Sequence, residues 1–189
     1  MNCQIVVIDF GSQVTKLIAR RIREIGVYCE IVPFQKVTKS FLKQSKLVKG
    51  FILSGGPASV GDSNSPEIEK KILEYRLPLL GICYGAQLLC KIFGGVIMKS
   101  KDREFGGAKL NFKKKSPLTD QINFSGKQNQ VWMSHSDVIE RLPPIFEVVS
   151  QTQNNVNAIF QNVEKKIYGV QFHPEVTQTI QGKKILKNF

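Results

Sequence analysis

Short apolar runs rich in Ile and Val alternate with amphipathic helical patterns along the first half of the chain. Gln4–Phe10 is a nearly continuous apolar run, which is typical of a strand buried on both faces. Gln13–Ile25 then places apolar side chains at helical spacing, and Gly26 follows as a stop signal. Such alternation predicts a parallel sheet with helices on both faces, and it excludes all-helical and all-β folds.

Within the first half, further strands are expected at Tyr28–Val32, Gly50–Leu53 and Leu79–Ile82, and helices at Pro66–Arg76 and Tyr84–Phe93. The second half of the chain has a different pattern. Beyond Gly95, strand-like runs dominate until a helical pattern at Thr179–Phe189; they are Val96–Met98, Gly107–Phe112, Gln130–Met133, Phe146–Thr152, Asn157–Gln161 and Ile167–Phe172. We therefore predict an α/β fold with a mostly parallel central sheet flanked by helices, extended by antiparallel strands in the C-terminal half.

Length and composition favour one globular domain over residues 1–189. The apolar fraction of 42% is too high for a disordered chain, and four scattered cysteines are too few for a disulfide scaffold. No apolar run approaches the ~20 residues of a membrane helix, and the N-terminal segment lacks the basic start of a signal peptide. We expect a cytoplasmic protein with reduced thiols and no membrane partner.

The net charge of +12 comes partly from two lysine-rich stretches, Lys99–Lys115 and the C-terminal Lys183–Lys187. Neither stretch interleaves basic residues with stacking aromatics, as single-strand binders do. We interpret the charge as a solvated face or a docking face for an acidic partner, and we expect no nucleic-acid binding.

Gly81-Ile82-Cys83-Tyr84-Gly85 is the strongest local motif, because it lies where a buried strand turns into a helix. Glycines two positions either side of a nucleophile permit a tight, strained strand-to-helix turn. The helix N-terminus also favours thiolate over thiol at Cys83. The alternative is a buried structural cysteine beside glycines that pack a helix.

A second motif, Gly169-Val170-Gln171-Phe172-His173-Pro174-Glu175, ends an apolar strand. Strand alternation puts His173 and Glu175 on the same face, where the carboxylate fixes the imidazole tautomer and stabilises its protonated form. Alone, His173 also fits a structural histidine. Together with Cys83 it suggests an activated cysteine nucleophile.

Leu53-Ser54-Gly55-Gly56-Pro57 follows the third strand, and its paired glycines can direct N–H groups at a developing oxyanion. With the N–H of Tyr84 they form a candidate two-donor oxyanion hole; an ordinary tight turn is the alternative. Dinucleotide and Walker A motifs are absent. The cysteines Cys3, Cys29, Cys83 and Cys90 form no C-x-x-C pair, so we expect no metal site.

The motifs LSGGP, GICYGAQ and GVQFHPE follow one another along the chain, and together they resemble those of the class I glutamine amidotransferase family. The resemblance covers essentially the whole chain and implies a flavodoxin-like fold. It also implies a Cys83–His173–Glu175 triad that hydrolyses L-glutamine to glutamate and ammonia through a γ-glutamyl thioester, with an oxyanion hole at Gly56 and Tyr84.

The same resemblance implies that Gln87 holds the amino-acid end of glutamine and that the backbone at Ser136 and Asp137 meets the substrate carboxylate. Family members carry glycine at the position of Ser136 and histidine at that of Gln178. The first departure matters if the loop needs a positive φ angle.

Three further segments, IDFGSQ near the start, REFG and VWMSHSD, resemble one branch of the family, in which the ammonia aminates XMP to GMP. The resemblance implies no cofactor in this domain and a partner synthetase (ATP-pyrophosphatase) domain, in the same full-length chain or on its own, that uses ATP and Mg. A homodimer of the full-length enzyme is also expected.

Other interpretations stay open at this point. The chain also fits a glutaminase component serving anthranilate or aminodeoxychorismate synthesis, or a catalytically silent scaffold of the same fold. A cysteine peptidase or isochorismatase-like hydrolase is a weaker alternative, because thiol–histidine–acid sites occur on many folds.

Overall fold

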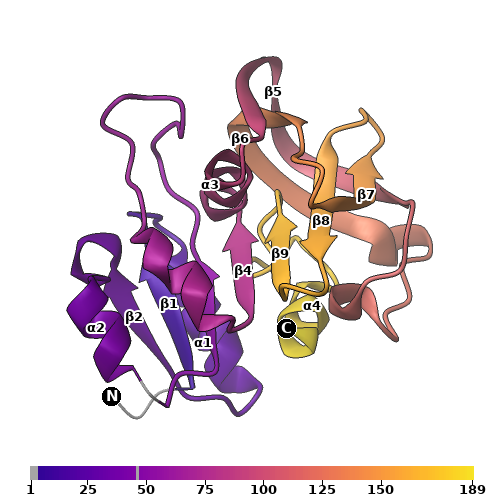
Figure 1. Cartoon of the computed structure of the whole chain (residues 1–189). Helices are drawn as coiled ribbons and strands as arrows, with labels where there is room; N and C mark the ends of the chain where they lie inside the picture. Colours follow the sequence, from indigo (N-terminus) through magenta and orange to yellow (C-terminus); the bar gives the residue numbers. More distant parts are fainter. Residues whose placement is uncertain (1–3, 46) are drawn as a thin grey trace.

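A nine-stranded mixed sheet forms the centre of the molecule in the computed structural model, which describes residues 4–45 and 47–189 (Figure 1). The strand order is β2-β1-β3-β4-β9-β8-β7-β5-β6. The first five strands in this order are parallel, and every later neighbouring pair is antiparallel. This confirms the predicted α/β class.

The parallel half places the carboxyl ends of its strands at one edge of the sheet. Its members are β2 (Cys29–Pro33), β1 (Ile5–Asp9), β3 (Gly50–Leu53), β4 (Leu79–Ile82) and β9 (Ile167–Val170). All residues of β3, β4 and β9 are buried, as their continuous apolar runs predict. β9 comes from the end of the chain but pairs directly with β4, with Gly81 opposite Gly169.

The antiparallel half comprises β8 (Asn157–Asn162), β7 (Glu147–Thr152), β5 (Val96–Phe112) and β6 (Gln130–Arg141). The predicted strands Val96–Met98 and Gly107–Phe112 are parts of the single long strand β5, whose pairing with β6 is interrupted by irregularities. β6 also runs well beyond the predicted Gln130–Met133. This long β5–β6 pair brings residues 134–137 alongside the parallel half.

Helices cover both faces of the sheet. α1 (Thr15–Glu24) and α4 (Gly182–Asn188) pack with Val7 on one face, and α2 (Lys39–Gln44) and α3 (Tyr84–Ile92) pack with Val6 and Ile8 on the other. Alternate β1 side chains thus enter different cores, as strand geometry requires. Four short 3₁₀ helices complete the described elements: η1 (Phe34–Lys36), η2 (Lys70–Tyr75), η3 (Pro117–Thr119) and η4 (Gly126–Asn129).

Two predicted helices are shorter than expected. Only Lys70–Tyr75 of Pro66–Arg76 is helical, and it is a 3₁₀ helix. The carbonyl of Pro66 accepts a hydrogen bond from the Tyr84 hydroxyl at 2.5 Å rather than from a helical N–H, and Arg76 ends η2 in the left-handed region. α4 begins at Gly182, not Thr179, because the preceding residues form turns, in which the N–H groups of Thr179 and Gly182 donate to carbonyls three residues earlier. Within the described residues, no helix has the length and apolarity that crossing a membrane requires.

Candidate active site

Cys83 lies in the turn between β4 and α3, where its backbone is held in an unfavourable conformation. Its φ of 51° and ψ of −107° are rare for a residue with a side chain. Its N–H donates to the Val170 carbonyl at 2.8 Å, and its carbonyl accepts from the N–H groups of Ala86 and Gln87. The turn is therefore fixed by β9 on one side and by α3 on the other.

Two glycines allow this turn to be tight. A Cβ on Gly81 would lie 2.6 Å from main-chain atoms of Gly85 and Ala86, and a Cβ on Gly85 would meet the main chain of Leu53. The Gly85 N–H donates to the Ser54 carbonyl at 3.1 Å. The predicted strained strand-to-helix turn is thus present, and it places the sulfur at the carboxyl edge of the sheet.

His173 and Glu175 are paired, but not in the way that strand alternation predicts. The distance from His173 Nδ1 to Glu175 Oε1 is 2.7 Å. β9 ends at Val170, so the pair lies in the loop beyond the strand, and the prediction that both residues share a strand face is wrong. Glu175 is fully buried and His173 is 8% exposed, so the contact is shielded from solvent.

The loop is held by contacts that the sequence patterns do not reveal. The His173 N–H donates to the Trp132 carbonyl at 3.0 Å, and the His173 carbonyl accepts from the Thr179 hydroxyl at 2.6 Å. Arg21 of α1 donates through Nε to the Glu175 carbonyl at 3.1 Å. These partners are separated from the loop in sequence or act through the main chain, so no sequence motif marks them.

The surroundings of His173 favour its protonated form. Burial acts to lower the pKa of the imidazole, but its interactions with Cys83 and Glu175, through hydrogen bonding and negative charge, raise the pKa to about 10. The three side chains therefore form one electrostatic unit, in which an imidazolium is stabilised between the sulfur and the carboxylate.

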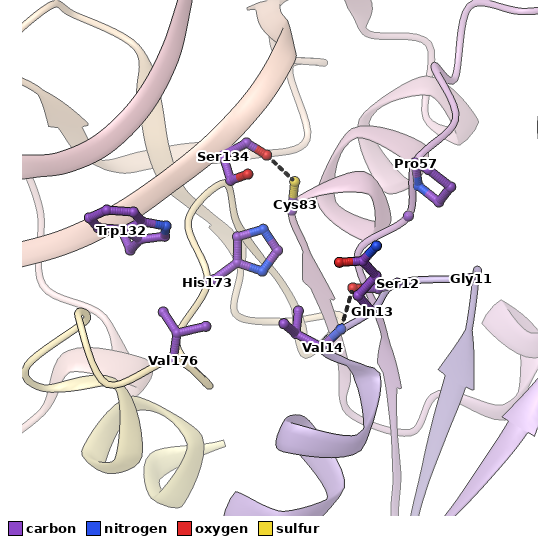
Figure 2. Close-up of a pocket in the computed structure, with 11 residues that line it drawn as sticks. Gly11, Ser12, Gln13, Val14, Pro57, Cys83, Trp132, Ser134, His173 and Val176 are labelled. Carbon is purple, nitrogen blue, oxygen red and sulfur yellow. Dashed lines mark hydrogen bonds between the residues drawn. The ribbon is translucent and has the colours of Figure 1, made fainter.

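The sulfur of Cys83 has two further neighbours. Its thiol donates to the Ser134 carbonyl of β6 over 3.7 Å, as Figure 2 shows, and Nε2 of Gln171 lies 3.8 Å from it. Gln171 is 1% exposed. Both lie within motifs quoted from the sequence, but neither was assigned a role there.

Two cavities meet at Cys83. One, of about 280 Å³, lies on the His173 side and is lined by Gly11, Ser12, Gln13, Val14, Gly56, Pro57, Cys83, Trp132, Ser134, His173 and Val176 (Figure 2). The other, of about 220 Å³, is lined by Gly56, Pro57, Ala58, Cys83, Tyr84, Gln87, Phe105, Ser134, His135, Ser136 and Asp137. The structure thus brings the sulfur, the predicted oxyanion donors and the predicted substrate contacts together.

The predicted oxyanion donors Gly56 and Tyr84 line the second cavity together with Cys83. Tyr84 is the first residue of α3, and Gly56 approaches Phe10 so closely that a Cβ would lie 2.9 Å from the Phe10 carbonyl oxygen. In the described part of the chain neither amide N–H has a hydrogen-bond partner. Both N–H groups are therefore available to a ligand, and their role as an oxyanion hole stays a prediction.

Gln87 and Asp137 are joined to each other. Gln87 Nε2 donates to the Asp137 carbonyl at 2.8 Å, and Gln87 is 3% exposed. The Oδ1 atom of Asp137 is buried and has no partner among the described residues. Gln87 therefore supports the wall of the second cavity, and its contact with substrate stays a prediction.

The departures at Ser136 and Gln178 do not strain the backbone. Ser136 is exposed and is not among the described residues with positive φ, so a serine fits where related sequences carry glycine. Gln178 is also exposed, and its carbonyl accepts from Gln130 Nε2 at 3.2 Å. The hydrogen bonds of the Cys83, His173 and Glu175 side chains involve neither residue.

The other described thiols lie in apolar surroundings. Cys29 and Cys90 are free and fully buried, and burial raises the pKa of both, that of Cys90 to about 12. Cys3 lies outside the described residues, as do the side chains of 100–104, which include part of the REFG segment and of the first lysine-rich stretch. Among the side chains that the structure describes, no group of three or more potential ligands is arranged to hold a metal ion.

Comparison with known protein families gives a match over almost the whole chain. The model of the family described as glutamine amidotransferase class-I matches residues 6–189. The chain is 48% identical, over 98% of its length, to the glutamine-hydrolysing GMP synthases of Mesorhizobium japonicum and Brucella melitensis. It covers only 35% and 36% of these two relatives, so it spans about a third of their length.

Solved structures show the same fold. A protein from Thermoplasma acidophilum, described as a candidate subunit of GMP synthase, superimposes with a TM-score of 0.80 at 30% identity, covering 100% of this chain and 92% of its own. A glutamine amidotransferase from Thermotoga maritima gives a TM-score of 0.72 at 20% identity, covering 96% of this chain and 80% of its own. The second likeness bears on the fold alone.

The strain at Cys83 has a measurable consequence for stability. We expect Cys83→Gly to be more stable than Cys83→Ala by about 1 kcal/mol, because glycine relieves the strained conformation while losing some entropy on folding. Urea unfolding of the two variants measures the difference. In the following helix, Ala86 is not among the described residues with positive φ, and Ala86→Gly should instead destabilise by at least about 1 kcal/mol. Equal stability of the two Cys83 variants would contradict a strained turn.

The raised pKa of His173 predicts how stability depends on pH. A pKa raised from 6.5 to about 10 gives stabilisation that is complete below pH 6.5 and is lost as pH rises through 10. The advantage of wild type over Glu175→Gln should therefore be larger at pH 6 than at pH 10. Because the chain has only two histidines, proton NMR can follow His173 directly. Its titration should move to lower pH in the variant; an unmoved titration would exclude Glu175 as a cause.

Proposed function

Because the chain belongs to the class-I glutamine amidotransferase family, we propose that it hydrolyses L-glutamine to glutamate and ammonia, with Cys83 as nucleophile. The observation that carries the proposal is the strained turn that presents the Cys83 sulfur beside the buried His173–Glu175 pair. A thiolate is the reactive form of cysteine, and a neighbouring imidazolium stabilises it.

In the first step of the proposed reaction, the Cys83 thiolate attacks the side-chain carboxamide carbon of glutamine. A carbon–sulfur bond forms, and the carbonyl electron pair moves to oxygen. The N–H groups of Gly56 and Tyr84, which lack partners among the described residues, donate hydrogen bonds to this negatively charged oxygen. Donors fixed before the reaction stabilise this charge without reorganising.

Ammonia leaves in the second step. The protonated His173 gives its proton to the nitrogen as the carbon–nitrogen bond breaks, so a γ-glutamyl thioester remains on Cys83. Neutral His173 then takes a proton from water as the water attacks the thioester, and glutamate departs with the thiolate and imidazolium restored. Glu175 keeps the imidazole oriented through its 2.7 Å contact with Nδ1 and stabilises the protonated form.

We further propose that the ammonia serves GMP synthesis, the activity in the names of the relatives that are 48% identical to this chain. Following the sequence resemblance, the acceptor is XMP, aminated by a synthetase domain that uses ATP and Mg. Since the chain spans about a third of those relatives, this domain is assigned to the remainder of the full-length protein or to a separate polypeptide.

Glutamate and ammonia release from glutamine tests the proposal, measured with the chain alone and with the synthetase part of a GMP synthase relative, XMP, ATP and Mg. We expect equal amounts of both products, low turnover alone and higher turnover with the partner. Cys83→Ala should lose at least about a thousandfold in turnover, as removal of a nucleophile does.

Cys90→Ala is the matched control, because it removes another buried thiol that lies outside both cavities. It should keep wild-type turnover. Glutamate release that persists in Cys83→Ala would contradict the assigned nucleophile. Release that the synthetase and XMP leave unchanged would contradict the assignment to GMP synthesis but not to glutamine hydrolysis.

A further inference from the structure

A chain of three hydrogen-bonding groups connects the wall of the second cavity to the Cys83 sulfur. The Asp137 carbonyl accepts from Gln87 Nε2 at 2.8 Å. The same nitrogen donates to Gln171 Oε1 at 3.3 Å, and Gln171 Nε2 lies 3.8 Å from the sulfur. Gln87 and Gln171 are 3% and 1% exposed, so these contacts are largely shielded from bulk solvent.

The direction of this chain follows from its first member. A backbone carbonyl only accepts hydrogen bonds, so the end of Gln87 that faces Asp137 must be its NH₂ group. That NH₂ group in turn requires the oxygen of Gln171 as its acceptor. The NH₂ group of Gln171 is left facing Cys83, and the orientation of both carboxamides is fixed without reference to the sulfur.

We propose that Gln171 is a positioning residue that holds the Cys83 sulfur and favours its thiolate form, with its orientation set by Gln87 and the Asp137 carbonyl. The inference deepens the proposed function, because it concerns the same nucleophile. An N–H donor stabilises a thiolate more than a thiol, because hydrogen bonds to charged groups are the stronger ones.

The other hydrogen-bonding neighbour of the sulfur explains why such a donor matters. The Ser134 carbonyl, 3.7 Å from the sulfur, accepts from a thiol but repels a thiolate. The sulfur therefore contacts one group that favours the thiol and one that favours the thiolate. Gln171 acts with the His173 imidazolium to offset the repulsion between the Ser134 carbonyl and the Cys83 thiolate.

The pH dependence of Cys83 alkylation by iodoacetamide tests the proposal, with the modified residue identified by peptide mapping. Gln171→Leu should move the midpoint of the rate profile up by about one pH unit, so that alkylation below the midpoint slows about tenfold. A merely structural role would lower the melting temperature without moving this midpoint.

Gln161→Leu is the matched control. Gln161 is also a buried carboxamide, 3% exposed, but it donates to Lys115 and Glu147. Its variant should keep the wild-type midpoint. If it shifts the midpoint as much as Gln171→Leu does, the shift is not specific and the proposal is overturned.

Gln87→Leu provides a second variant, which also decides the matter if Gln171→Leu does not fold. Leucine removes the NH₂ group that binds the Gln171 oxygen and adds no charge near the sulfur, so the Gln171 amide is no longer held with its nitrogen toward Cys83. The midpoint should then rise, though no further than in Gln171→Leu. Wild-type midpoints in the folded variants would overturn the proposal.

The alkylation experiment tests the role of Gln171, and the glutamate-release experiment tests the proposed function, so one proposal can be contradicted while the other stands. Iodoacetamide needs no glutamine site, so an unmoved midpoint with intact glutamate release would remove the role of Gln171 alone. A shifted midpoint in a protein that never releases glutamate would contradict the proposed function and leave the role of Gln171 standing.

Discussion

The strained backbone of Cys83 is the constraint on which the rest of the site depends. The β4–α3 turn places a residue with a side chain at a φ of 51°, and it persists because Gly81 and Gly85 allow strand and helix to pack closely. The hydrogen bond from the Cys83 N–H to the Val170 carbonyl joins the same turn to the neighbouring strand β9. Backbone strain of this kind costs roughly 1–3 kcal/mol and persists only where the surroundings fix it. Here it presents the sulfur to two cavities.

The strand order supplies the partners of the sulfur. β9 pairs with β4, so the loop beyond it brings His173 and Glu175 to Cys83 although they follow it by about ninety positions. The antiparallel half contributes β6, which places the Ser134 carbonyl against the thiol and residues 135–137 around the second cavity. A parallel sheet alone would supply the nucleophile and its base, whereas the added strands enclose the site.

Much of this arrangement is predictable from the sequence because it depends on local patterns. The continuous apolar runs at Gly50–Leu53 and Leu79–Ile82 match β3 and β4, and the glycine spacing around Cys83 predicts its turn. The pairing of His173 with Glu175 was predicted, but for a wrong reason, because a loop rather than a strand holds them. The contacts of Gln171, Thr179 and Arg21 with the site were missed, since they join segments that are distant in sequence or act through the main chain. The segment Pro66–Arg76 is helical only over Lys70–Tyr75, and its start is joined to Tyr84 by a tertiary hydrogen bond that the apolar spacing does not reveal.

Covalent labelling with a diazo-ketone analogue of glutamine, followed by intact mass and peptide mapping, shows whether Cys83 is an activated thiol in a glutamine-binding site. We predict a single adduct on Cys83 that glutamine prevents from forming, because among the described thiols only this one lies at the cavities while Cys29 and Cys90 are buried in the cores. Labelling that is absent both alone and with the synthetase partner and XMP, or that falls equally on Cys83, Cys29 and Cys90, would contradict an activated thiol in a glutamine-shaped site.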